Sequence, residues 1–188
     1  MMTIMRYPEG HKEAVRQRIV DAAAAAMRAH GLAGVSIPGL MKSAGLTHGG
    51  FYVHFADRDE LVAAAVEAAG AATSKGAFGD SLTLEETLAR YLSMGHVEHP
   101  EEGCVVAALG TDGARQAPRV RTAFADVARG LLRLVERKLH GDRPARTLSD
   151  EALRVASTMV GAVVLARLVD DAKLADRILR SARESAAV

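Results

Sequence analysis

Helix-capping residues and helix-stopping glycines divide most of this chain of 188 residues into helical segments joined by short connections. Ser36, Asp57 and Thr83 each precede a helix-like segment, and a glutamate follows Asp57 and Thr83 at the spacing of a capping box. Gly31 and Gly45 stand where such segments stop. Aromatic residues are scarce, at 4% of the chain. The pattern predicts an all-α fold.

The expected helices separate into two groups. The first group comprises 12–30, 36–45, a short helix beginning after Thr47, and a fourth helix from Asp57 to about Thr73. The second comprises a helix from Thr83 that Pro100 breaks, a segment at 103–116, a long helix opened by Pro118, and final helices at 149–169 and 171–186. Because a tight glycine turn joins its second and third helices, the first group has a helix-turn-helix pattern. We expect an N-terminal domain of residues 1–56 and a larger helical domain of residues 57–188, joined through the fourth helix.

Composition and apolar patterning exclude several classes of protein. Hydrophobic residues make up 49% and charged residues 25% of the chain, which is typical of globular proteins and not of disordered ones. Outside an alanine-rich stretch, the longest apolar run is Met159–Ala166, far shorter than the ~18 residues of a membrane span. The first ten residues lack the apolar core of a signal peptide, so we expect a cytoplasmic protein. A single cysteine, Cys104, excludes an intrachain disulfide.

Charge is distributed unevenly along the chain. The formal net charge is +1, but residues 1–54 carry +3 and the remainder carries −2. This asymmetry is mild. It is compatible with an anion-binding N-terminal end and does not by itself establish one.

The stretch LTHGGFYVHF, residues 46–55, combines two adjacent glycines with three of the chain's seven Phe and Tyr residues. Phe51 and Phe55 are four residues apart, so they share one helix face and can seat a short helix on its neighbours. Gly49 and Gly50 cost helix stability but, without a Cβ, let the backbone approach another molecule closely. Tyr52 lies off the Phe51–Phe55 face, which leaves its hydroxyl free.

Residues 12–61 resemble the DNA-binding domain of the TetR/AcrR family of transcriptional regulators. The resemblance rests on four stretches, which are Ser36-Ile37 before Leu40, Ala44-Gly45-Leu46, Gly49 to Phe55, and Arg58-Asp59-Glu60-Leu61. The rest of the chain resembles the family's variable regulatory domain in its architecture. The resemblance implies a ligand-responsive repressor, without enzymatic activity or cofactor, that binds a palindromic operator in double-stranded DNA as a homodimer. A small-molecule effector bound to the C-terminal domain would release it.

The resemblance also implies a set of DNA contacts. The candidates are Lys12, Arg16, Ser36, Thr47, His48, Gly49, Tyr52, His54 and Arg58. Thr47 and His48, at the start of the recognition helix, are expected at or near base edges, while Tyr52 is expected to donate to a phosphate. Plainer alternatives remain open at this point: Thr47 only caps its helix, His54 only supports the turn, and Lys12 and Arg16 form a solvated face.

The helix at 149–169 carries small and branched apolar residues together, which permits close helix approach. In the family the last two helices of each subunit form a four-helix dimer interface, and the resemblance implies the same here. The candidate interface residues are Leu153, Ala156, Val160, Gly161, Val163 and Val164. The alternative is that this stripe is ordinary core.

Relatives bind small hydrophobic molecules between their middle helices. The candidate pocket residues are Tyr91, Met94, His96, Cys104, Val105, Phe124 and Met159. Plain core remains the alternative for this apolar set. Cys104 is either a redox or electrophile sensor, as in some family members, or a buried small hydrophobe.

Three other hypotheses are a metal site, an enzyme and an interaction module; the first two involve the histidines near Cys104, and the third follows from the weak basic charge. His96, His99 and Cys104 have metal-like spacing, but a fourth ligand is missing, so we expect no metal site. An enzyme using Cys104 with His96 or His99 lacks an identifiable third orienting group or oxyanion loop. A helical interaction module that does not bind DNA is the last alternative.

Overall fold

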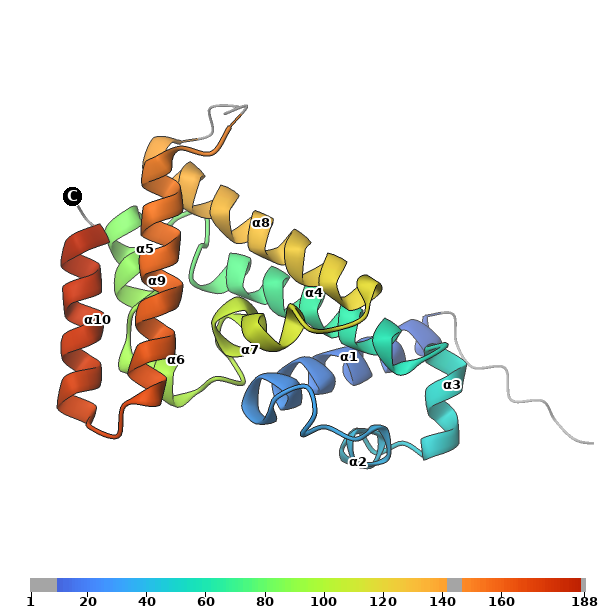
Figure 1. Ribbon diagram of the computed structural model, residues 1–188. Coiled ribbons are helices and arrows are strands. Elements are labelled where there is room, and N and C mark those ends of the chain that lie inside the picture. The colour runs from blue at the N-terminus through green and yellow to red at the C-terminus, as the bar shows by residue number, and fades with distance from the viewer. Residues whose placement is uncertain (1–9, 142–146, 187–188) are drawn as a thin grey trace, which may run out of the picture.

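The computed structural model describes residues 10–141 and 147–186, and in this part of the chain all regular structure is helical, which confirms the predicted all-α class (Figure 1). The first helices are α1 (His11–His30), α2 (Ile37–Ser43), a 3-10 turn (His48–Gly50), α3 (Phe51–His54) and α4 (Arg58–Gly76). They are followed by α5 (Leu84–Tyr91), α6 (Met94–Glu98), α7 (Val105–Gly113), α8 (Pro118–His140), α9 (Asp150–Leu168) and α10 (Ala172–Ala186). The first nine residues of the expected N-terminal domain lie outside the described residues.

The predicted helix caps are largely present. The Ser36 hydroxyl accepts a hydrogen bond from the Gly39 amide at 3.2 Å, and the Asp57 carboxylate accepts one from the Glu60 amide at 2.7 Å. Thr83 forms a complete capping box with the glutamate three residues later. Gly31 ends α1 with a φ of +78°, a conformation that glycine adopts without strain. Local capping chemistry therefore sets these boundaries.

Two boundaries differ from the expectation. The Thr47 side chain makes no capping hydrogen bond, so the predicted cap is wrong, and the recognition segment begins as a 3-10 turn instead. Pro100 does not break the helix that starts after Thr83, because that helix ends at Tyr91 and Ser93 then caps the new helix α6. The Ser93 hydroxyl accepts from the His96 amide at 3.2 Å, which lets the chain start a second helix well before the proline.

The first four helices share a core with the helices that follow. The buried cluster that contains Ile19, Met41 and Phe51 also contains Leu109 of α7 and Phe124 of α8. The α1 helix is further tied to the loop between α6 and α7, because the Arg28 guanidinium donates to the Glu101 carbonyl, with Nε at 2.8 Å. The expected domain boundary at residues 56 and 57 stays a prediction, and this core crosses it.

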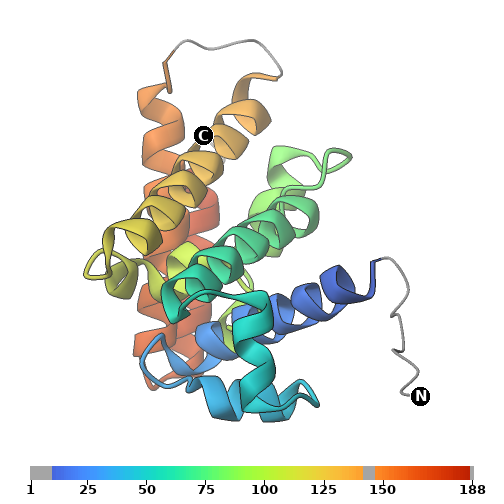
Figure 2. The ribbon, with the colours of Figure 1, turned by 90° about the vertical axis from the view of Figure 1, so that its right-hand side faces the viewer.

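Helices α4 and α8 run side by side in both views of the molecule (Figures 1 and 2). They approach closely at Gly70, where an added Cβ would lie 2.8 Å from both methyl groups of Val127. A second core cluster joins α5, α8, α9 and α10. Helices α9 and α10 lie at the end of the molecule opposite to α2 and α3 (Figure 1).

None of the helices in residues 10–141 and 147–186 combines the length and the apolarity needed to cross a membrane.

Candidate nucleic-acid interface

The short α3 helix has one buried and one exposed face. Phe51 and Phe55 are 0% and 1% exposed, and their rings stack with centroids 5.5 Å apart. Tyr52 and Val53 are 64% and 59% exposed. A Cβ added to Gly49 would have nothing within 4 Å, so the backbone before α3 is open to close approach. The segment therefore presents an aromatic ring, an aliphatic side chain and bare backbone outward.

Val53 is a candidate contact that the sequence reasoning missed. It lies two residues after the buried Phe51, which places it about 200° around a helix and so on the opposite face. That helical spacing was the signal that could have found it. The predicted residues Lys12, Ser36, Thr47, His48 and Gly49 are all exposed as well.

Two of the cations predicted to contact DNA are engaged within the protein. The Arg16 guanidinium lies 4.8 Å from the centroid of the Phe55 ring and 3.6 Å from a Glu60 carboxylate oxygen. Arg58 donates to the Leu32 carbonyl from the start of α4. These contacts hold both side chains in place beside α3.

His54 lies at the end of α3, close to the positive charges of Lys12 and Arg16. Burial lowers the pKa of His54, and the two neighbouring cations lower it further. Its Nδ1 atom is buried and has no hydrogen-bond partner among the described residues. Because both influences favour the neutral ring, His54 offers a hydrogen bond to an approaching anion and not a full charge.

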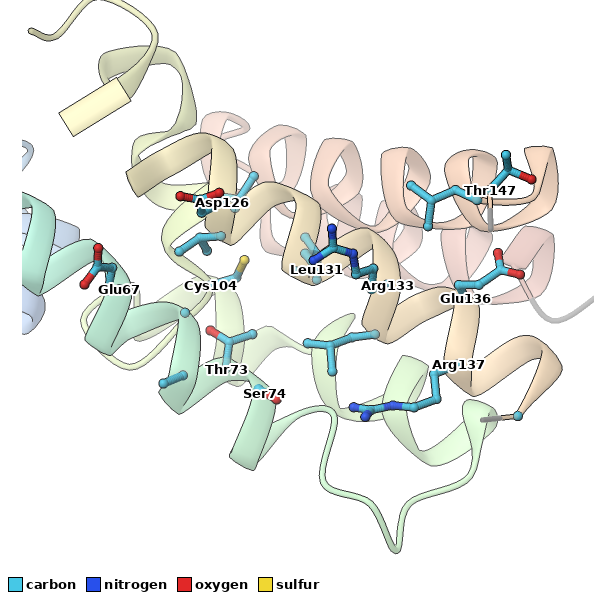
Figure 3. A pocket seen from close by; sticks show the side chains of 18 residues that line it. Glu67, Thr73, Ser74, Cys104, Asp126, Leu131, Arg133, Glu136, Arg137 and Thr147 are labelled. Atoms are coloured by element: carbon cyan, nitrogen blue, oxygen red, sulfur yellow. The ribbon is translucent and has the colours of Figure 1, made fainter. Parts of the chain in front are cut away.

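A groove of about 640 Å³ lies between α4 and α8 (Figure 3). Apolar side chains such as Val127, Leu131 and Leu134 line it, together with charged residues that include Glu67 and Arg133. Of the seven predicted pocket residues, only Cys104 lines this groove.

The other predicted pocket residues lie elsewhere. Tyr91 and His96 join Cys104 around a smaller pocket of about 260 Å³. Val105, Phe124 and Met159 are buried in the two core clusters, and Met94 packs against one of them. These four residues therefore serve as core, the alternative that the apolar pattern left open.

His96 connects the end of α5 to the start of α7. Its Nδ1–H donates to the Tyr91 carbonyl at 2.6 Å, and its Nε2 accepts from the Cys104 amide at 2.9 Å. Burial is the main cause that lowers the pKa of His96, and the nearby Arg167 charge acts in the same direction. Because both ring nitrogens bind backbone groups, His96 has no free nitrogen to activate the Cys104 thiol.

His96, His99 and Cys104 are spaced like metal ligands in the sequence, but their side chains do not form a metal-binding cluster in the structure. His99 is directed at the Glu101 carboxylate, with 3.3 Å between Nδ1 and the oxygen. Within the described ranges, no group of three or more His, Cys, Asp or Glu residues is arranged to hold a metal ion.

The predicted interface residues divide between the inside and the outside of the chain. Ala156 and Val163 are 3% and 0% exposed and pack in this chain's own core. Leu153 is exposed, while Val160, Gly161 and Val164 are partly exposed. The sequence reasoning missed the exposed leucines of this end, which are Leu165 and Leu168 on α9 and Leu174 on α10. A shallow groove lined by Gly161 and Leu165 runs between the two helices.

Comparison with known proteins gives a family match for the N-terminal part. Residues 19–65 match the model of the bacterial regulatory proteins of the tetR family. No curated protein matches the chain.

Solved structures match almost the whole chain. The reduced form of NemR from E. coli is 19% identical, with a TM-score of 0.72, and the match covers 92% of this chain and 95% of that one. A TetR transcriptional regulator from Chloroflexus aurantiacus J-10-FL is 26% identical, with a TM-score of 0.69 over 94% of this chain and 93% of that one. The multidrug binding protein EbrR, solved with imidazole, is 24% identical, with a TM-score of 0.60 over 93% and 95% of the two chains.

Proposed function

Because the chain belongs to the TetR family of helix-turn-helix, DNA-binding transcription regulators, we propose that it is a repressor that binds a palindromic operator as a homodimer. A small molecule bound between its C-terminal helices releases it from DNA. The observation that carries the proposal is the outward face of α3, where Tyr52 and Val53 are exposed while Phe51 and Phe55 anchor the helix. A regulator of this class acts on DNA without enzymatic activity, and we place it in the cytoplasm.

In this proposal the segment from Thr47 through α3 enters the major groove of the operator. Thr47 and His48 contact base edges, and the open backbone at Gly49 allows close approach to the duplex. Tyr52 donates its hydroxyl to a phosphate oxygen, and Lys12 and Ser36 bind phosphates at the flanks.

Arg16, His54 and Arg58 complete the proposed phosphate contacts. Since Arg16 and Arg58 already bind Glu60 and the Leu32 carbonyl, they are held in fixed positions, and DNA binding costs them little side-chain entropy. His54 lies beside the Lys12 and Arg16 charges and would add a hydrogen bond from its neutral ring.

Dimerisation would use the outer face of α9 and α10. Leu153, Val160, Gly161 and Val164 would contact the second copy together with the exposed leucines of this face. The two recognition helices would then meet half-sites about 34 Å apart or at a small multiple of that spacing.

The groove between α4 and α8 is the proposed effector site. Its volume of about 640 Å³ falls within the range of small-molecule pockets, and its lining is mostly apolar. EbrR, which has the same fold, was solved with imidazole bound. Because α4 lines the groove and also follows directly on α3, an effector that changes the position of α4 would change the position of α3.

A second way of sensing is favoured by the place of Cys104, which lines the groove although it is only 3% exposed. The thiol would then be oxidised or alkylated by an effector that enters the groove. In that case the variant Cys104→Ser would keep DNA binding but lose its release by a thiol-reactive compound.

The test of the main proposal is a fluorescence anisotropy titration with DNA selected from a random library, at a series of salt concentrations. We expect a sequence-specific complex that weakens as salt rises, because phosphate contacts release counterions. The double variant Tyr52→Phe with Arg58→Ala loses this complex. The control Lys173→Ala on α10 removes the same charge far from α3 and binds like the wild type. Failure to select any specific sequence would refute DNA binding.

A further inference from the structure

The Tyr91 hydroxyl is a buried donor without a partner. The side chain is 1% exposed, and no hydrogen-bond partner of its oxygen is found in the described part of the chain. Burial raises the pKa of Tyr91 well above its ordinary value, and the neighbouring Cys104 thiol adds to the effect. A thiol is a weak acceptor, so the hydroxyl keeps most of its capacity to donate. Such a group destabilises a fold unless something else binds it.

Tyr91 lines the smaller pocket, which adjoins the groove. That pocket has a volume of about 260 Å³. Two side chains, Thr73 of α4 and Cys104 at the start of α7, line both the pocket and the groove. Figure 3 shows these two side chains between α4 and α8. Because they line both spaces, these residues form the boundary between the groove and the pocket that Tyr91 lines.

The other polar groups at this boundary are already bound. The Thr73 hydroxyl donates to the Ala69 carbonyl at 3.0 Å. Both ring nitrogens of His96 bind backbone groups, as described above. Among the buried side chains that line the pocket, the Tyr91 hydroxyl is therefore the donor that remains for a bound ligand.

Electrostatics favour an acceptor with partial negative charge. The Arg167 guanidinium is close enough to Tyr91 to oppose the rise of its pKa, and it is held in place by the His96 carbonyl at 2.6 Å. The guanidinium does not line the pocket, so it acts through its field and not by contact. Arg90, His99 and Glu102 also line the pocket, but they are exposed to solvent. The single buried donor, the Tyr91 hydroxyl, therefore matches one neutral carbonyl oxygen. A buried carboxylate would need more partners than this pocket offers.

We propose that the groove and the smaller pocket form one effector site with two compartments, and that the effector is an apolar ring compound with a terminal carbonyl group. The rings lie in the groove between α4 and α8, and the carbonyl oxygen accepts a hydrogen bond from Tyr91. Small movements of Thr73 and Cys104 open the boundary. This inference rests on the effector site proposed above and adds the chemical class of the ligand.

The test uses two probes of nearly equal size, 2-acetylnaphthalene and 2-ethylnaphthalene, which differ in one carbonyl oxygen. Their binding to the full chain is measured by displacement of the fluorescent probe N-phenyl-1-naphthylamine. We expect the ketone to bind about 3- to 10-fold more tightly than the hydrocarbon, as one net hydrogen bond provides. The variant Tyr91→Phe binds both probes equally, with the affinity of the wild type for the hydrocarbon.

Two further measurements separate binding from folding. Gly130 lines the groove, and a Cβ added to it would have nothing within 4 Å. The variant Gly130→Leu therefore fills part of the groove without unfolding the chain, and we expect weaker binding of both probes. The carbonyl stretch of the bound ketone shifts to lower wavenumber in the wild type and not in Tyr91→Phe. Thermal melting of Tyr91→Phe is expected at the wild-type temperature or above, because the substitution removes an unpaired buried hydroxyl.

Equal affinity of the wild type for the two probes, a ketone preference that survives in Tyr91→Phe, or no binding of either probe overturns the inference. The anisotropy titration with DNA, repeated on the same preparation, distinguishes this failure from that of the proposed function. If the protein forms a specific DNA complex but shows no preference for the ketone, only the proposed ligand class is overturned. Loss of the DNA complex removes the regulator proposal as well.

Discussion

Neighbouring aromatic residues in α3 have separate tasks. Phe51 is fully buried and stacks on Phe55, so Phe51→Ala leaves a cavity and lowers the free energy of unfolding by about 3–5 kcal/mol. Tyr52 is exposed, so Tyr52→Ala changes it by at most about 0.5 kcal/mol but weakens DNA binding strongly. Urea unfolding and DNA anisotropy on both variants check this. Equal losses of stability would contradict the division of tasks.

His96 makes stability depend on pH. Its pKa is lowered in the folded chain from its ordinary value of 6.5, so the unfolded chain takes up a proton first as the pH falls. The contribution of His96 to stability is therefore complete above about pH 6.5 and is lost as the pH falls through the folded pKa. We expect a lower free energy of unfolding at pH 5 than at pH 7.5.

The variant His96→Gln tests this dependence, since glutamine retains one donor and one acceptor. It should show a smaller difference between the two pH values in urea unfolding. The pKa of His54 is lowered as well, so His54→Gln serves as the matched comparison. It should remove only the contribution of His54 to the pH dependence of the free energy of unfolding. Unchanged pH dependence in His96→Gln would exclude the histidine as the cause.

The helix-capping residues could be predicted from the sequence, but the direction in which the apolar side chains of α9 point could not. Ser36 and Asp57 cap their helices as expected because a cap needs only a few neighbouring residues. Ala156 and Val163 were expected at an interface but point into the chain's own core. The direction depends on which face of α9 packs against α8 and α10. Because α9 has apolar residues on several sides, its sequence alone does not show which face is buried.

The absence of a side chain at Gly70 allows α4 and α8 to pack closely at this position. In Gly70→Ala the new methyl group meets Val127 at 2.8 Å, so overpacking lowers the free energy of unfolding by about 1–3 kcal/mol. Combining it with Val127→Ala restores part of this loss. The matched control is Gly130→Ala on α8, which has open space around it and gains up to about 1 kcal/mol from helix propensity.

A double-mutant cycle in urea unfolding measures the interaction between positions 70 and 127. If the two losses simply add, then the helices have room to shift apart and the close contact is not a constraint.

Element boundaries were predictable where a cap and a stop signal agree. The expected long helix from Thr83 to Pro100 is instead α5 and α6, because Ser93 starts a new helix inside it. The sequence contains the serine, but the apolar spacing around it continues and conceals the break. The groove between α4 and α8 was not predictable, because it joins helices that are distant in sequence.

At the scale of the whole molecule, the exposed leucines predict self-association. Leu168 is 75% exposed and Leu165 is 54% exposed, both on α9. We expect the double variant Leu165→Glu with Leu168→Glu to be monomeric in analytical ultracentrifugation, while the wild type is a dimer. Helix content stays unchanged, because both side chains lie at the surface. A wild type that is monomeric at micromolar concentration would contradict the proposed interface.

The core that joins the first helices to α7 and α8 also limits how such proteins can be recombined. A chimera that exchanges only residues 10–56 would separate Ile19 and Phe51 from Leu109 and Phe124, which lie in the same buried cluster. It would also separate Arg28 from the Glu101 carbonyl. New operator specificity is therefore not transferable as an independent cassette, and an exchange has to carry the matching faces of α4, α7 and α8 with it.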